Sequence, residues 1–100
     1  MKKVFISGKI TGEPIRKCVD KFSLAYSVLW MKESISTEII NPLILKGIHF
    51  GISHKEAMKI CRAELKTCTH IYMLKDWKES KGAKDEHQFA VDNGIEIIYE

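Results

Sequence analysis

Cysteine is scarce in this sequence, and long apolar runs are absent. The three cysteines, Cys18, Cys61 and Cys68, are an odd number without a C-x-x-C pair, which favours reduced, buried thiols over a disulfide framework or a zinc site. No apolar run approaches the roughly 20 residues of a membrane span, and the run from Val4 to Ile6 is too short for a signal peptide. We therefore expect a soluble, cytoplasmic protein that does not bind membranes.

The sequence also has little excess of positive over negative charge. The net charge is +3, and the lysines are spread along the chain instead of forming a dense block, which argues against dedicated nucleic-acid binding. His49, His54, His70 and His87 show no metal-ligand spacing with carboxylates or thiols, so we expect ordinary surface or capping roles for them and no metal. The slight positive bias suits a phosphorylated small molecule.

The pattern of apolar residues alternates between strands and helices over one hundred residues, enough for one domain with one core. It predicts strands at residues 4–6, 38–40, 71–74 and 95–99, and helices at residues 14–30, from 53 to about 68, and 82–93. Residues 43–52 show no clear period and are expected to form a loop. The alternation predicts a single α/β domain over residues 1–100. We expect a three-layer sandwich with a four-stranded, mostly parallel sheet in the order 2-1-3-4, of the Rossmann or flavodoxin-like type.

Helix boundaries carry local signals. Residues 53–56 read S-x-x-E, which fits a capping box. The apolar residues that follow them mark one helical face as far as Cys68. Asn93 and Gly94 are typical of the end of a helix.

Three loops follow the first three predicted strands, at residues 7–12, 41–42 and 75–81. In an open parallel sheet, ligands bind beyond the carboxyl ends of the strands, so these loops are expected to meet around one site. The third loop runs into a helix N-terminus, whose free N–H groups and dipole favour an anion. We expect a phosphate or carboxylate of the ligand to bind there.

Glu86 is the most informative single residue. On the predicted helix it shares a face with Ala83 and Ala90, while Asp85 and Asp92 point elsewhere. Small neighbours let the helix approach the sheet or a ligand closely, one turn inside the helix N-terminus. A solvated surface glutamate and a functional carboxylate are equally good interpretations of this placement alone.

Two further features leave their function open. Gly8 and Gly12 follow a strand but form neither the dinucleotide fingerprint nor a P-loop, so they indicate a tight turn more than a phosphate site. Trp77 in a polar loop could equally stack on a base or cover the edge of the core.

A family resemblance extends over nearly the whole chain. The segments at residues 5–12, 40–42 and 73–83, followed by Glu86, resemble in order and spacing the DUF4406 family, a group similar to nucleoside 2-deoxyribosyltransferases and deoxynucleoside-monophosphate N-glycosidases. The most specific part is W-x-x-S-x-G-A-x-x-E, which begins at Trp77.

The resemblance implies cleavage or transfer of the N-glycosidic bond of a (deoxy)nucleoside or its 5′-monophosphate, without metal or other cofactor. A glutamate attacks C1′ through an oxocarbenium-like transition state, and Glu86 matches that nucleophile. Ser80 matches a residue that binds the sugar or its phosphate, Phe5 stands where those enzymes often carry a tyrosine, and Lys9 and Thr11 match a loop at the 5′ end of the nucleotide. The complete set of expected substrate-binding residues is Phe5, Ser7, Gly8, Lys9, Thr11, Asn41, Cys61, Trp77, Ser80 and Gly82.

One position departs from the family pattern. Cys61 stands where the enzymes carry an aspartate that handles the proton of the leaving base, and a thiol with a pKa of about 8.5 is a poor substitute. Glu64, one turn further along but about 60° around the helix, and Asp76, at the mouth of the expected cleft, are the alternative proton donors.

Two other functions compete with the enzyme. One is a catalytically weak nucleotide-binding or sensing module of the same fold. The other is a phosphoryl-accepting receiver domain, which the residues Ser7, Gly8 and Lys9 disfavour because no acidic cluster follows the first strand. Since related enzymes complete their sites with a neighbouring subunit, we also expect a homodimer with two-fold symmetry.

Overall fold

The structure is a computed structural model that describes residues 1–49 and 51–100. In chain order its strands and α-helices are β1 (Lys3–Ser7), α1 (Ile15–Lys32), β2 (Glu38–Ile40), α2 (His54–Leu65), β3 (His70–Met73), α3 (Lys81–Asp92) and β4 (Glu96–Tyr99), with short 3-10 helices η1 (Pro42–Ile44) and η2 (Trp77–Glu79). None of the described helices is long and apolar enough to cross a membrane.

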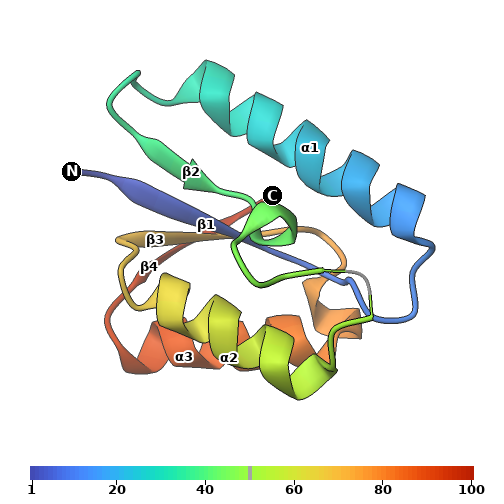
Figure 1. The fold of residues 1–100 in the computed structure, drawn as a ribbon. Coiled ribbons are helices and arrows are strands. Elements are labelled where there is room, and N and C mark those ends of the chain that lie inside the picture. Colours follow the sequence, from blue (N-terminus) through green and yellow to red (C-terminus); the bar gives the residue numbers. More distant parts are fainter. Residues whose placement is uncertain (50) are drawn as a thin grey trace.

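The four strands form one parallel sheet in the order β2-β1-β3-β4. Phe5 in the central strand β1 lies opposite Ile40 on one side and Ile71 on the other. Helix α1 covers one face of the sheet, and α2 and α3 cover the other (Figure 1). The predicted fold class and strand order are thus confirmed, and the domain is a Rossmann-like three-layer sandwich.

Alternation along β1 divides the core between the two faces. Val4 and Ile6 pack in the layer beneath α1, whereas Phe5 packs among buried residues of α2 and α3. All three side chains are fully buried, and each such burial contributes about 1.5–3 kcal/mol. The same alternation turns Ser7, the last residue of β1, toward α2 and α3.

Both helices on that face begin at a serine cap. The hydroxyl of Ser53 accepts a hydrogen bond from the Glu56 N–H at 3.1 Å, and that of Ser80 accepts one from the Ala83 N–H at 3.1 Å. These bonds satisfy N–H groups that have no partner inside the helix. They therefore set the first residues of α2 and α3, whose N-termini lie beside the carboxyl end of β1.

Some predicted boundaries need correction. Helix α2 ends at Leu65 and does not reach Cys68, which is nevertheless buried in the following turn and bonds through its thiol to the Glu64 carbonyl. The expected loop at residues 43–52 overlaps η1, which forms because the Asn41 side chain caps it; residue 50 lies outside the described part. The expected polar loop after β3 contains η2.

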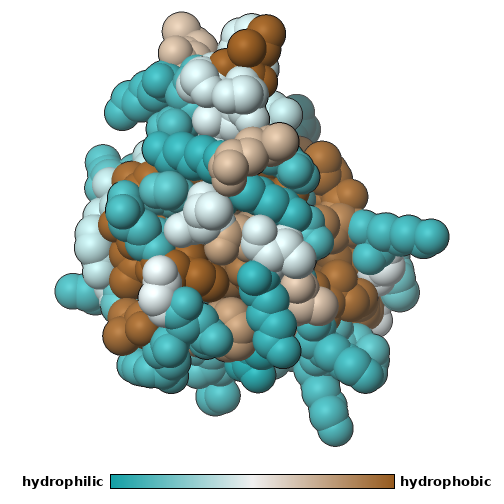
Figure 2. Space-filling view, turned by 90° about the vertical axis from the view of Figure 1, so that its left-hand side faces the viewer, coloured by the Kyte–Doolittle hydropathy of each residue, from teal (hydrophilic) through white to brown (hydrophobic). Residues whose placement is uncertain are grey.

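The two ends of the sheet differ in character. Figure 2 shows the end at which the strands begin, where hydrophilic side chains are mixed with small hydrophobic patches. The opposite end, where the strands stop, carries the loops at residues 8–13 and 74–80 and the N-termini of α2 and α3. The candidate site lies at that second end.

Candidate functional site

A pocket of about 240 Å³ opens beyond the carboxyl end of β1, between the N-termini of α2 and α3 and the loop after β1. Most of its wall is apolar, with a few polar groups, as in ordinary small-molecule sites. The described residues that line it are Ile6, Ser7, Gly8, Ile10, Thr11, Pro42, Ile52, His54, Ala57, Met58, Cys61, Ser80, Gly82, Ala83 and Glu86.

Glu86 supplies the carboxylate of this pocket. It is 7% exposed, on the buried face of α3 with Ala83 and Ala90, as its spacing predicts. The Ser7 hydroxyl donates a hydrogen bond to Glu86 Oε1 at 2.6 Å. Burial raises the pKa of Glu86 to about 7, although the Ser7 bond and the charge of Arg62 act in the opposite direction. The carboxyl group can therefore change its protonation state near neutral pH.

Cys61 faces the same pocket from α2. Burial, reinforced by the nearby charge of Glu86, raises the pKa of its thiol to about 12. A thiol with this pKa stays protonated at neutral pH and is a poor proton donor. Cys61 therefore forms part of the wall, and its raised pKa disfavours an acid–base role.

Two glycines allow the elements around the pocket to approach closely. A Cβ atom on Gly8 would lie 2.6 Å from Leu74 Cδ1, and Leu74 is fully buried. A Cβ on Gly82 would lie 3.1 Å from Met58 Sδ and 3.3 Å from His54 Cε1. Gly8 thus lets the loop after β1 lie against the end of β3, and Gly82 lets α3 pack against α2.

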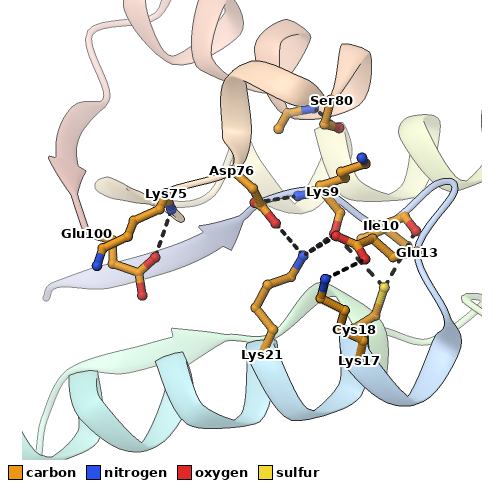
Figure 3. A network of polar contacts seen from close by, with 11 residues as sticks. Lys9, Ile10, Glu13, Lys17, Cys18, Lys21, Lys75, Asp76, Ser80 and Glu100 are labelled. Atoms are coloured by element: carbon orange, nitrogen blue, oxygen red, sulfur yellow. Dashed lines mark hydrogen bonds and ion pairs between the residues drawn. The ribbon is translucent and has the colours of Figure 1, made fainter.

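An ion pair clamps the loop after β1 (Figure 3). Asp76 accepts hydrogen bonds from the Lys9 backbone N–H at 3.0 Å and from Lys21 Nζ at 2.5 Å, and Lys21 Nζ also donates to the Lys9 carbonyl at 2.7 Å. Burial acts to raise the pKa of Asp76, but the bonds from Lys21 and Lys9 outweigh it and lower the pKa. Both polar groups of the Lys9 backbone are held by one Asp–Lys pair.

Seven of the predicted site residues meet at the pocket, and six do not line it. Those brought together are Ser7, Gly8, Thr11, Cys61, Ser80, Gly82 and Glu86. Those placed elsewhere are Phe5, Lys9, Asn41, Glu64, Asp76 and Trp77.

The two alternative acids have other partners. Glu64 pairs with Lys3 at 3.2 Å, at the amino end of β1 and hence at the opposite end of the sheet from the pocket. Both oxygens of Asp76 are engaged in the clamp described above. The structure therefore brings neither carboxylate to Glu86, and the lowered pKa of Asp76 makes it a poor proton donor.

The remaining residues outside the pocket have structural contacts. Phe5 is core, and the Asn41 side chain accepts a hydrogen bond from the Leu43 N–H. Trp77 packs on the core edge and stacks on His87 with ring centroids 4.2 Å apart. Of the two interpretations of Trp77, the structure shows the cover of the core edge.

Sequence reasoning missed His54 and Met58, which line the pocket from the first two turns of α2. The capping box at Ser53 could have located this helix N-terminus, but only the packing of Gly82 against both side chains shows that α2 closes the site. In the described part of the chain, no group of three His, Cys, Asp or Glu side chains could hold a metal ion.

Comparison with known families identifies the family of this chain. Residues 2–99 match the domain family of unknown function DUF4406. The chain belongs to the DUF4406 family. Searches of the curated proteins and of the solved structures each gave no match. For this DUF4406 domain, the function must therefore be argued from the pocket itself.

Proposed function

We propose that this DUF4406 domain cleaves or transfers the N-glycosidic bond of a 2′-deoxynucleoside or its 5′-monophosphate, with Glu86 as the nucleophile. The observation that carries the proposal is the buried Glu86 carboxylate, held by Ser7 inside a mostly apolar pocket. The resemblance of the sequence to nucleoside 2-deoxyribosyltransferases supports it. A carboxyl group with a perturbed pKa in a pocket is a candidate for catalysis, and the ionised form that a nucleophile requires is populated at about pH 7 and above.

In the first step, a Glu86 oxygen bonds to C1′ of the sugar while the bond from C1′ to the base nitrogen breaks, and the electron pair leaves with the base. The base takes up a proton from an acid. Water, or a second base, then attacks C1′ and passes a proton to the conjugate base of that acid, while the bond from C1′ to Glu86 breaks and releases the carboxylate. With water as acceptor, the products are the free base and deoxyribose or its 5-phosphate. The Ser7 hydroxyl holds Glu86 in position throughout.

The proton for the leaving base needs a donor other than Cys61. Among the described residues that line the pocket, His54, Cys61 and Glu86 are the titratable ones. Because Glu86 is the proposed nucleophile and the Cys61 thiol holds its proton too tightly, we assign the donor role to His54 at the N-terminus of α2.

The 5′ group of the nucleotide is assigned to the side of the pocket beside the N-terminus of α3. Ser80 and Thr11 line it there, and the N-terminus of α3 lies beside them, where N–H groups favour an anion. The Lys9 side chain extends to the side on which Ser80 lies (Figure 3). We propose these groups as the phosphate subsite, and a homodimer as the assembly that covers the open side.

The second candidate is a nucleotide-sensing module. It is favoured by one observation, the Cys61 thiol in a wall position where a carboxylic acid would assist the leaving base. Such a module would bind the same ligands without turnover. Loss of one general acid typically costs about 10²–10⁴ in rate.

Turnover separates the two functions. The protein would be incubated with 2′-deoxynucleosides and their 5′-monophosphates, with free base followed by chromatography and affinity by calorimetry. We expect base release that falls by on the order of 10³ or more in Glu86→Gln. The matched control Glu96→Gln, at an exposed glutamate at the start of β4, should keep the wild-type rate. Binding without turnover would establish the sensing module, and no binding by any compound would refute both.

A further inference from the structure

A groove runs along the outer surface where α2 meets α3, and its lining is strongly basic. It is lined by five lysines and arginines against two acids, Glu56 and Asp85, which leaves a net charge of +3. The basic residues are Lys55, Lys59, Arg62, Lys66 and Lys81. The groove therefore carries as much net positive charge as the whole chain.

Four of these residues form a row on α2. Lys55, Lys59, Arg62 and Lys66 follow one another at intervals of four, three and four residues, which places them on one face of the helix. At 1.5 Å per residue the row extends over about 16 Å. Its cations are about 4.5–6 Å apart along the axis, a spacing that can follow a chain of phosphates.

The cations of this row differ in their partners from several lysines on the other side of the sheet. None of the four forms an ion pair with another described residue, and Arg62 stacks over the Phe89 ring instead. On the side of α1, by contrast, Lys2 pairs with Glu33 and Lys21 with Asp76. Four cations without an ion pair to a described residue thus lie next to one another in the groove.

The groove is continuous with the proposed nucleotide pocket. His54 and Met58 line both of them. Lys81, in the first turn of α3, lines the groove next to Ser80 and Gly82, which line the pocket. If a ligand in the pocket has phosphate groups that extend out on this side, those phosphates would contact the row of cations.

We infer that the natural ligand is a nucleotide within a single-stranded oligonucleotide, whose neighbouring phosphates lie in the groove between α2 and α3. This inference rests on the proposed function, and it departs from the expectation drawn from the even spread of lysines in the sequence. Folding gathers onto one helix face cations that the linear order separates. The triphosphate chain of a single nucleotide is shorter than the row, and a flat membrane surface would not use a concave groove.

Affinity and its salt dependence test the inference. A fluorescent oligodeoxynucleotide of about six residues, a deoxynucleoside 5′-monophosphate, a deoxynucleoside 5′-triphosphate and anionic lipid vesicles would each be titrated with the intact protein. We expect the oligonucleotide to bind at least tenfold more tightly than the monophosphate at low salt. Its log Kd should change with log salt with a slope of about 3, because each of four cations contributes about 0.7 on a single strand.

The variant Lys59→Gln/Lys66→Gln removes two cations that line the groove but not the pocket. It should lower that slope by about 1.4 and weaken oligonucleotide binding about tenfold, while the monophosphate affinity stays within twofold. The control Lys32→Gln/Lys75→Gln removes two exposed lysines outside the groove and should change neither.

Each other result overturns the inference in a recognisable way. If the monophosphate binds and the oligonucleotide binds no more tightly, the groove assignment fails while the proposed function stands. If the triphosphate binds as tightly as the oligonucleotide, or if vesicles bind more tightly, the groove binds a ligand other than a single-stranded oligonucleotide. If the mononucleotides show neither binding nor turnover, the proposed function fails as well.

Discussion

The domain holds two carboxylates at the same end of the sheet in opposite environments. Glu86 is buried against one hydroxyl, and burial raises its pKa to about 7. Asp76 is partly exposed and bonded by Lys21 and the Lys9 N–H, and these bonds lower its pKa despite the opposing effect of burial. One group is kept near its neutral form, and the other is kept ionised.

The difference assigns the two residues to different tasks. A carboxylate that is costly to ionise and lines a pocket is available for chemistry, whereas one saturated by cationic and N–H donors can only hold structure. Asp76 and Lys21 hold the Lys9 backbone, and the adjoining Gly8 and Ile10 line the pocket. The ion pair between Asp76 and Lys21 thus positions the loop that forms one wall of the pocket around Glu86.

The largest effect should come from the pH dependence of stability at Glu86. Below about pH 4.5 the group is protonated in both the folded and the unfolded state. Above that pH the unfolded chain ionises first, so the free energy of unfolding falls as pH rises through about 7. The shift corresponds to about 3 kcal/mol, and Glu86→Gln should remove this decline in denaturant titrations.

The control for that titration is Glu96→Gln, which alters an exposed glutamate and should keep the wild-type decline. Equal pH profiles for wild type and Glu86→Gln would show that Glu86 is not held near its neutral form.

Loss of the ion pair between Asp76 and Lys21 should have a smaller effect on stability than the change at Glu86. Its dependence on pH should have the opposite sign. Because the pKa of Asp76 is lowered, its stabilisation is present above the ordinary value of 3.8 and is lost as pH falls through the folded pKa. Asp76→Asn should cost about 1–2 kcal/mol at pH 7, since both side chains of the pair are about one-fifth exposed. The difference from wild type in urea titrations should disappear at strongly acid pH.

Asp85→Asn is the matched control for the clamp, because Asp85 pairs with Lys81 in an exposed i,i+4 pair. It should cost less than about 0.5 kcal/mol. If Asp76→Asn lowers the free energy of unfolding no more than this control does, the proposed structural role of Asp76 is wrong.

The smallest of these effects concerns the Ser7 hydroxyl, whose hydrogen bond opposes the raised pKa of Glu86. Ser7→Ala should cost about 1 kcal/mol at alkaline pH and move the midpoint of the Glu86-dependent decline to higher pH. NMR titration of the Glu86 carboxyl would measure the midpoint directly, with Ser23→Ala, an exposed serine of α1, as control. If the midpoint is unchanged in Ser7→Ala, the Ser7 hydroxyl does not affect the pKa of Glu86.

The sequence was sufficient for the fold and for one side of the pocket. The apolar runs predicted the strands and helices, and the winding rules for parallel α/β sheets predicted the strand order. The Ala83–Ala90 stripe correctly placed Glu86 on a buried face. The partners of the other carboxylates could not be predicted, because Lys21 meets Asp76 and Lys3 meets Glu64 only across elements far apart in sequence. For the same reason the approach of α2 to Gly82, which brings His54 to the pocket, has no local signal.

The most direct test of the account is a search for the covalent sugar intermediate on Glu86. The protein would be incubated with a 2′-fluoro-2′-deoxynucleoside or its 5′-monophosphate, whose fluorine slows reactions with an oxocarbenium-like transition state, and then digested and examined by mass spectrometry. The account predicts a mass increase equal to the fluorinated sugar on the peptide that contains Glu86, and none in Glu86→Gln. Release of base from an ordinary deoxynucleotide at the wild-type rate by Glu86→Gln would contradict it.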